Sequence, residues 1–112
     1  MKTSEVLSGL KALGITLADA GDPKQALLNW AADGLLIPPE GLRAGEEEWS
    51  AETLAEAAAL HVMIFRYGFQ KDTMQTVRTR LINKLREAHN DMTTVADCIA
   101  EDAFYDYLPS VL

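Results

Sequence analysis

Two histidines and one cysteine are the side chains of this chain best suited to acid–base, nucleophilic or metal chemistry. His61 and His89 lie far apart in the sequence, and neither is followed by a second metal-type ligand three or four residues later, as zinc sites on helices require. Cys98 has no second cysteine with which to form a disulfide or a CxxC pair, and a free cysteine behaves mostly as a small buried hydrophobe. We therefore expect neither a metal site nor a cofactor.

The sequence also lacks the short motifs that mark common catalytic sites. It contains no GxSxG, no Walker-type glycine loop, no GxGxxG and no HExxH, which are the signatures of several large enzyme classes. Carboxylate pairs such as Glu52 with Glu56 occur in any acidic helical domain and carry no specific signal. We expect a protein that is not an enzyme.

Composition and charge narrow the class of protein further. The chain has 112 residues, is 48% apolar and 24% charged, and carries a net charge of −7. These values are typical of one globular domain over residues 1–112, and no apolar run approaches the ~20 residues of a membrane span. The first residues lack a secretory pattern. We expect a cytoplasmic protein without a membrane partner, and the net charge argues against a general nucleic-acid coat protein.

Charge is distributed unevenly along the chain. Residues 57–86 hold six bases and one acid, whereas residues 87–112 hold six acids and no base. The basic segment could meet phosphates, the acidic face of a partner protein or the acidic C-terminal segment. We favour the last of these, as pairing within one chain or between subunits.

Start and stop signals divide the chain into short helices and one hairpin. In chain order the expected helices run from Thr3 or Ser4 to Gly14, from Leu17 to Ala20, from Lys24 to Asp33, from Ala51 to Tyr67, from Asp72 to Asn90 and from Thr93 or Thr94 to Tyr107. Asp22 before Pro23 is a strong start signal, Ser50 is a good N-cap, and Pro109 should end the last helix. An apolar run, two prolines and two glycines in residues 35–45 indicate a small hairpin before Trp49.

Three motifs occur in a recognisable order within residues 16–81. Residues 22–38 place Trp30 four residues before a Gly-Leu-Leu-Ile-Pro sequence; residues 49–54 read Trp-Ser-Ala-Glu-Thr-Leu; and residues 67–69 read Tyr-Gly-Phe. Together they resemble the MerR-type winged helix-turn-helix family. The resemblance implies a mainly α fold, with a winged-helix core at residues 15–70 that includes a β-hairpin wing, and two further helices at residues 72–112. It also implies a small DNA-binding transcriptional regulator, or a DNA-binding protein of excisionase or phage type.

Under this resemblance, the recognition helix would read base edges in the major groove through Lys24, Gln25 and Asn29. Phosphates would be held by Arg43, Arg66, Lys71 and Arg78. The competing interpretation is that the three helix residues are ordinary solvent-facing side chains, whereas Trp30 is expected in the core.

The chain departs from the family at two places. Leu28 and Asn29 stand where the family usually has an arginine that contacts a phosphate, and the wing carries Glu46, Glu47 and Glu48, which would repel a phosphate backbone. In these departures the chain is similar to the CbpM-like chaperone modulators, which use a MerR-like domain to bind the J-domain of a co-chaperone. The alternative function is therefore an acidic protein-binding modulator, or an inhibitor of a nucleic-acid-binding protein. Its three glutamates would then contact a basic partner, unless they form only a solvated turn.

An apolar stripe beyond the winged domain predicts either core completion or a homodimer. Its members recur at helical spacing and are joined by two residues of the last helix: Met74, Val77, Leu81 and Leu85, with Ile99 and Phe104. Because related regulators dimerise through a helix in this position, we expect a homodimer.

Overall fold

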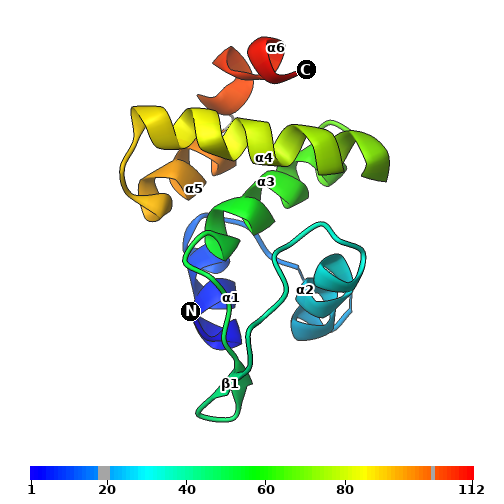
Figure 1. Cartoon of the computed structure of the whole chain (residues 1–112), viewed down its shortest axis with the longest axis vertical. Helices are drawn as coiled ribbons and strands as arrows, with labels where there is room; N and C mark the ends of the chain where they lie inside the picture. Colours follow the sequence, from blue (N-terminus) through cyan, green and yellow to red (C-terminus); the bar gives the residue numbers. More distant parts are fainter. Residues whose placement is uncertain (18–20, 102) are drawn as a thin grey trace.

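The computed structural model describes residues 1–17, 21–101 and 103–112. This part of the chain is mainly helical and includes one small antiparallel sheet of two strands (Figure 1). In chain order the elements are α1 (Thr3–Ala12), α2 (Pro23–Ala32), β1 (Leu42–Arg43), β2 (Glu46–Glu47), α3 (Thr53–Phe65), α4 (Lys71–Ala88), α5 (Met92–Ala100), the 3-10 helix η2 (Ala103–Asp106) and α6 (Leu108–Val111). The molecule measures 40 × 28 × 24 Å, with the hairpin at one end of its long axis and α6 at the other (Figure 1).

Helix α3 forms the centre of the core. Every residue from Thr53 to Leu60 is buried, and α1, α4 and α5 all contact this helix. The alanines at positions 55, 57, 58 and 59 are fully buried, and their small side chains let α5 approach closely. The stretch from Thr53 to Leu60 is apolar around most of its circumference, and neighbouring elements enclose it.

Helix α2 begins where the sequence predicts. The Asp22 side chain accepts a hydrogen bond of 3.1 Å from the Lys24 backbone N–H, and Pro23 occupies the first turn. Gly34 follows the helix with a φ of 77°, a conformation that glycine adopts without strain. The short helix expected from Leu17 to Ala20 falls mostly on residues 18–20, outside the described residues. Leu17 itself is buried but lies in no helix.

The expected hairpin is present as β1 and β2. Leu42 pairs with Glu47 and Arg43 with Glu46, and the two turn residues, Ala44 and Gly45, have φ values of 53° and 81°. Positive φ at both central residues is the signature of the type I′ turn, whose twist matches that of the strands. Residues 1–2 run beside the end of the hairpin, where Lys2 forms an isolated bridge with Glu48 and the Trp49 backbone N–H donates to the Met1 carbonyl.

Several helix ends differ from the predicted ones. The N-caps of α1, α3 and α4 are Lys2, Glu52 and Gln70, in place of Thr3 or Ser4, Ser50 and Asp72. In place of the last expected helix the structure has α5 and η2. A further helix, α6, begins after Tyr107, and Pro109 lies in its first turn instead of ending the pattern. These elements turn the chain so that Phe104, Leu108 and Val111 all reach the core.

The stripe that suggested a dimer interface lies in the core of a single chain. Its members are at most 4% exposed: Met74, Val77, Leu81, Leu85, Ile99 and Phe104. These side chains pack against α3 and α5 within one molecule, so they are not available to a second copy. Their burial within one chain favours core completion over a dimer interface. The homodimer stays a prediction.

Candidate functional site

The side of α2 that faces solvent is polar. Lys24, Gln25 and Asn29 are all exposed, and Gln25 Nε2 donates a hydrogen bond of 3.0 Å to Asn29 Oδ1. The opposite side of the helix buries Ala26 and Leu27, while Trp30 is only half-buried against the core. The three residues proposed to read bases thus share one accessible surface, which we call the α2 face.

The C-terminal end of α2 is fixed by the first turns of α4. Gln75 Nε2 donates to the Asp33 carbonyl at 3.1 Å, and Arg78 Nη1 donates to the Gly34 carbonyl at 2.9 Å. Lys71 Nζ lies 3.7 Å from the Asp33 carboxylate. Donors and positive charge at the C-terminal end of a helix satisfy its last carbonyls and oppose its dipole. Two of the bases expected to hold phosphates therefore anchor α2.

Arg78 is also committed to a buried carboxylate that the sequence did not reveal. Arg78 Nε lies 3.9 Å from Glu56 Oε2, and the two side chains are only 13% and 9% exposed. Burial raises the pKa of the Glu56 carboxyl, although Arg78 and the Ile37 backbone N–H oppose that rise. Burial likewise lowers the pKa of Arg78. A guanidinium that is largely buried, lies beside a carboxylate and donates to the Gly34 carbonyl is poorly placed to contact a DNA phosphate.

Arg43, the lone base of the hairpin, lies between two carboxylates. Its Nη2 is 2.9 Å from Glu5 Oε1, and its Nε is 2.8 Å from Glu48 Oε2. The Arg43 side chain remains 56% exposed, but the two acids outnumber its single charge. Leu42, the other residue of β1, is 73% exposed. Its apolar side chain could therefore contact a partner.

The three hairpin glutamates hold the N-terminal end of α1. The Glu46 carboxylate accepts from the Ser4 backbone N–H at 2.9 Å and from its hydroxyl at 3.1 Å, and Glu47 accepts from the Thr3 hydroxyl at 2.9 Å. These Ser4 hydrogen bonds lower the pKa of Glu46, and the bond from Arg43 lowers that of Glu48.

An anionic group at a helix N-terminus satisfies unpaired N–H groups and opposes the helix dipole. The glutamates at positions 46–48 are therefore not the solvated turn that the sequence suggested. Their interactions within the chain also compete with the contact to a basic partner expected in the alternative.

Several bases of residues 66–86 have, among the described residues, partners other than the acids of the C-terminal segment with which we expected them to pair. The ion pairs of α4 in the described part of the chain go to Asp33, Glu52 and Glu56, and none of them goes to residues 87–112. Arg66 Nη1 donates to the Ala100 carbonyl at 3.0 Å, which places Arg66 beside the C-terminal helices and away from the α2 face. Among the described residues, Lys71, Arg78 and Arg86 therefore pair with acids outside the C-terminal segment, whereas Arg66 contacts that segment through a backbone carbonyl. Pairing between subunits stays a prediction.

Other candidate sites offer little chemistry. Cys98 Sγ lies 3.5 Å from His89 Nε2, and burial raises the pKa of the thiol, which disfavours the nucleophilic thiolate. The described residues contain no group of three or more His, Cys, Asp or Glu side chains that could hold a metal ion. No helix in the described part of the chain is both long and apolar enough to span a membrane.

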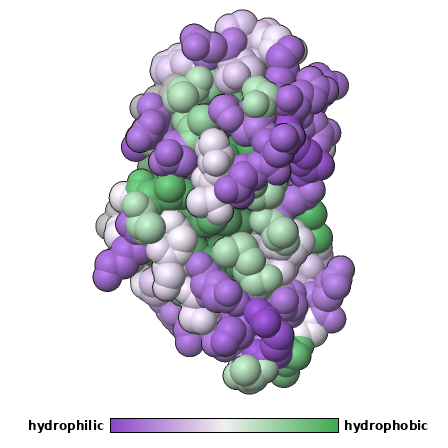
Figure 2. All heavy atoms as spheres, turned by 90° about the vertical axis from the view of Figure 1, so that its left-hand side faces the viewer, coloured by the Kyte–Doolittle hydropathy of each residue, from purple (hydrophilic) through white to green (hydrophobic). Residues whose placement is uncertain are grey.

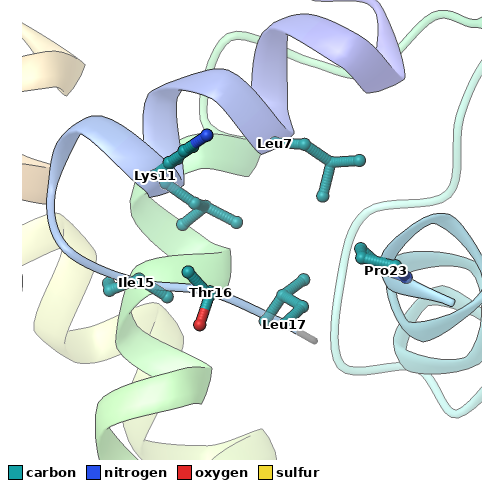
Figure 3. A pocket seen from close by; sticks show the side chains of 7 residues that line it. Leu7, Lys11, Ile15, Thr16, Leu17 and Pro23 are labelled. Atoms are coloured by element: carbon teal, nitrogen blue, oxygen red, sulfur yellow. The ribbon is translucent and has the colours of Figure 1, made fainter. Parts of the chain in front are cut away.

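A pocket of about 260 Å³ opens between α1, residues 15–17 and the start of α2 (Figure 3). Leu7, Leu17 and Pro23 border it from three sides, and Lys11 and Thr16 are the polar side chains in its lining. In the view of Figure 3 the Lys11 amine lies along α1 and the Thr16 hydroxyl points away from it. The two polar groups therefore do not converge on one point, as catalysis or ligand orientation would need.

The α2 face, the adjoining hairpin and the α4 contacts that fix α2 are thus the features on which a function can be argued. Comparison of the chain with protein families, with characterised proteins and with solved structures finds no match.

Proposed function

We propose that this chain is a protein-binding domain of MerR-like winged-helix type, and that the hairpin and the α2 face dock on a partner protein. The observation that carries the proposal is that two of the arginines expected to hold phosphates lie beside carboxylates of the same chain. Arg43 lies between Glu5 and Glu48, and Arg78 is held by Glu56. A phosphate approaching either base would meet those carboxylates as well, which opposes binding to DNA.

Exposed apolar side chains in the hairpin and in the segment before it support the same conclusion. Leu42 in β1 is 73% exposed, and Ile37 and Pro38 in the preceding segment are exposed, Ile37 at 39%. Apolar side chains at this position would gain little from a phosphate backbone, whereas a protein partner can bury them. Glu40 is exposed beside them in the sequence, so the partner surface that fits best is an apolar depression with a basic rim.

DNA binding is the second candidate, and the α2 face is the observation that favours it. Lys24, Gln25 and Asn29 are accessible together on a helix that α4 fixes in place. Arg80 and Lys84, one helical turn apart on α4, are exposed and take part in no ion pair among the described residues. They would be the bases left to contact phosphates in a DNA complex.

A direct measurement separates the two candidates. Fluorescence anisotropy with a mixed-sequence DNA duplex at ~50 mM salt, where phosphate attraction is strong, should show no saturable binding. Saturable binding that is lost in the triple variant Lys24→Ala, Gln25→Ala and Asn29→Ala would establish the DNA candidate and overturn the proposal.

The protein-binding proposal has its own test in a pair of matched variants. Protein retained by the tagged chain from native cytosol should survive nuclease treatment, and Leu42→Ser should weaken its retention at least about fivefold, as expected for an exposed side chain that becomes an anchor. Leu112 is similarly exposed, at 69%, and Leu112→Ser serves as the control. Equal retention by both variants would show that the hairpin is not the docking surface.

A further inference from the structure

An aromatic cluster lies on the opposite side of the core from the hairpin, where the end of α3 meets η2. Consecutive residues of η2 point in different directions, because Phe104 is fully buried and Tyr105 is 56% exposed. Tyr67 contacts both rings edge to face, with centroid distances of 5.8 Å to Phe104 and 5.0 Å to Tyr105. Phe104 and the Tyr67 ring thus hold the exposed Tyr105 ring in a fixed orientation.

Further aromatic surface adjoins this cluster on the α3 side. The Phe69 ring lies 6.1 Å from that of Tyr67 and is half-buried. Phe65, at the end of α3, is 54% exposed and its ring lies 4.7 Å from that of His61. Aromatic residues are enriched where proteins bind one another.

The charge around the cluster selects the partner. Residues 87–112 carry six acids and no base, and Asp97, Glu101 and Asp106 are exposed around the end of α5 and η2. Arg66, at the end of α3, brings a positive charge to this region through its bond to the Ala100 carbonyl, but the acids outnumber it. A nucleic acid, or the same acidic face of a second copy, would therefore be repelled, whereas a cationic segment would be attracted.

We propose that this aromatic cluster and its acidic surroundings bind an arginine-rich segment of a partner protein. Arginine fits both features, because a guanidinium stacks on the face of a tyrosine or phenylalanine ring and pairs with carboxylates. This surface is separate from the hairpin, which lies at the other end of the long axis (Figure 1). The inference goes beyond the proposed function and does not depend on it.

The test uses the full chain and two synthetic peptides of equal length, one rich in arginine and one rich in glutamate. Titration of the arginine peptide should shift the backbone amide resonances of residues 65–69 and 103–107 in a saturable way, and added salt should weaken the binding. The glutamate peptide should produce no such shifts. Shifts that map to the hairpin or α2, or equal binding of both peptides, would overturn the proposal.

A pair of variants tests the aromatic contribution. Tyr105→Leu keeps an apolar side chain at an exposed position but removes the ring face, and it should weaken binding of the arginine peptide about two- to fivefold, the range expected for an exposed cation–π contact. Leu42→Ala is the control at the other end of the molecule and should leave this affinity unchanged. An unchanged affinity in Tyr105→Leu would exclude the ring from the contact. If Leu42→Ser fails to weaken retention of cytosolic protein while the arginine peptide still binds, only the function proposed for the hairpin is contradicted.

Discussion

At the scale of single residues, the Glu56–Arg78 pair joins three parts of the molecule. Glu56 belongs to α3 and Arg78 to α4, and Arg78 also donates to the carbonyl of Gly34 at the end of α2. Removing one member of a buried pair leaves the other charge without compensation, which typically costs about 3–5 kcal/mol. We expect Arg78→Met to lower the free energy of unfolding by an amount in or somewhat below that range, since the pair is 3.9 Å apart and not fully enclosed.

The pH dependence of this variant provides the check. Burial already raises the pKa of Glu56, and loss of Arg78 should raise it further. A carboxyl whose pKa is raised on folding contributes stability below its unfolded pKa and loses that contribution as pH rises through the folded value. Urea unfolding should therefore show a smaller difference between Arg78→Met and the parent chain at pH 4 than at pH 7. The double variant Arg78→Met with Glu56→Gln should recover part of the lost free energy of unfolding, because it removes the uncompensated carboxylate. Equal differences at both pH values would mean that Glu56 is not the group responsible.

At the scale of elements, the hairpin acts as a cap for α1. Glu46 accepts hydrogen bonds from the backbone and side chain of Ser4, and these bonds lower its pKa. A carboxylate with a lowered pKa contributes stability above its unfolded pKa, and that contribution is lost as pH falls through the folded value. We expect Glu46→Gln to lower the thermal unfolding midpoint at pH 7, with the difference from the parent chain shrinking in acid. Glu40→Gln, at an exposed position before the hairpin, is the control and should show neither effect.

The elements also show what a sequence can predict. The start of α2, its glycine stop and the hairpin with its Gly45 turn follow from local signals, because caps and turns depend on neighbouring residues. The capping of α1 by residues 46–48 could not be predicted in the same way, since the donors at Thr3 and Ser4 lie more than forty positions earlier in the chain. The end of α5 at Ala100 was not predicted, because the apolar residues of this segment continue at helical spacing, and local spacing does not show that Phe104 reaches the core from η2.

At the scale of the whole molecule, the uneven charge was visible in the sequence but its pairing was not. Helix α4 crosses α3 (Figure 1), and three of its bases, Lys71, Arg78 and Arg86, pair with Asp33, Glu56 and Glu52, which precede α4 in the chain. The three-dimensional path of α4 therefore decides which acids are neutralised. Hydrophilic residues cover much of the upper and lower parts of the face shown in Figure 2, and apolar residues lie across its middle.

Burial and charge in the whole molecule argue against the predicted homodimer. The apolar stripe of α4 and the last helices is enclosed within one chain, and the C-terminal part, with six acids and no base, would repel its equivalent in a second copy. We therefore expect a monomer. Light scattering at micromolar concentration should give a mass of 12.3 kDa at ~50 mM and at ~500 mM salt, two conditions with very different screening of charge. A dimer that forms only at high salt would show that charge repulsion holds exposed apolar surfaces apart. A dimer at both salt concentrations would mean that a surface other than the enclosed stripe joins the copies, and Leu42→Ser and Tyr105→Leu would then identify which end of the molecule carries it.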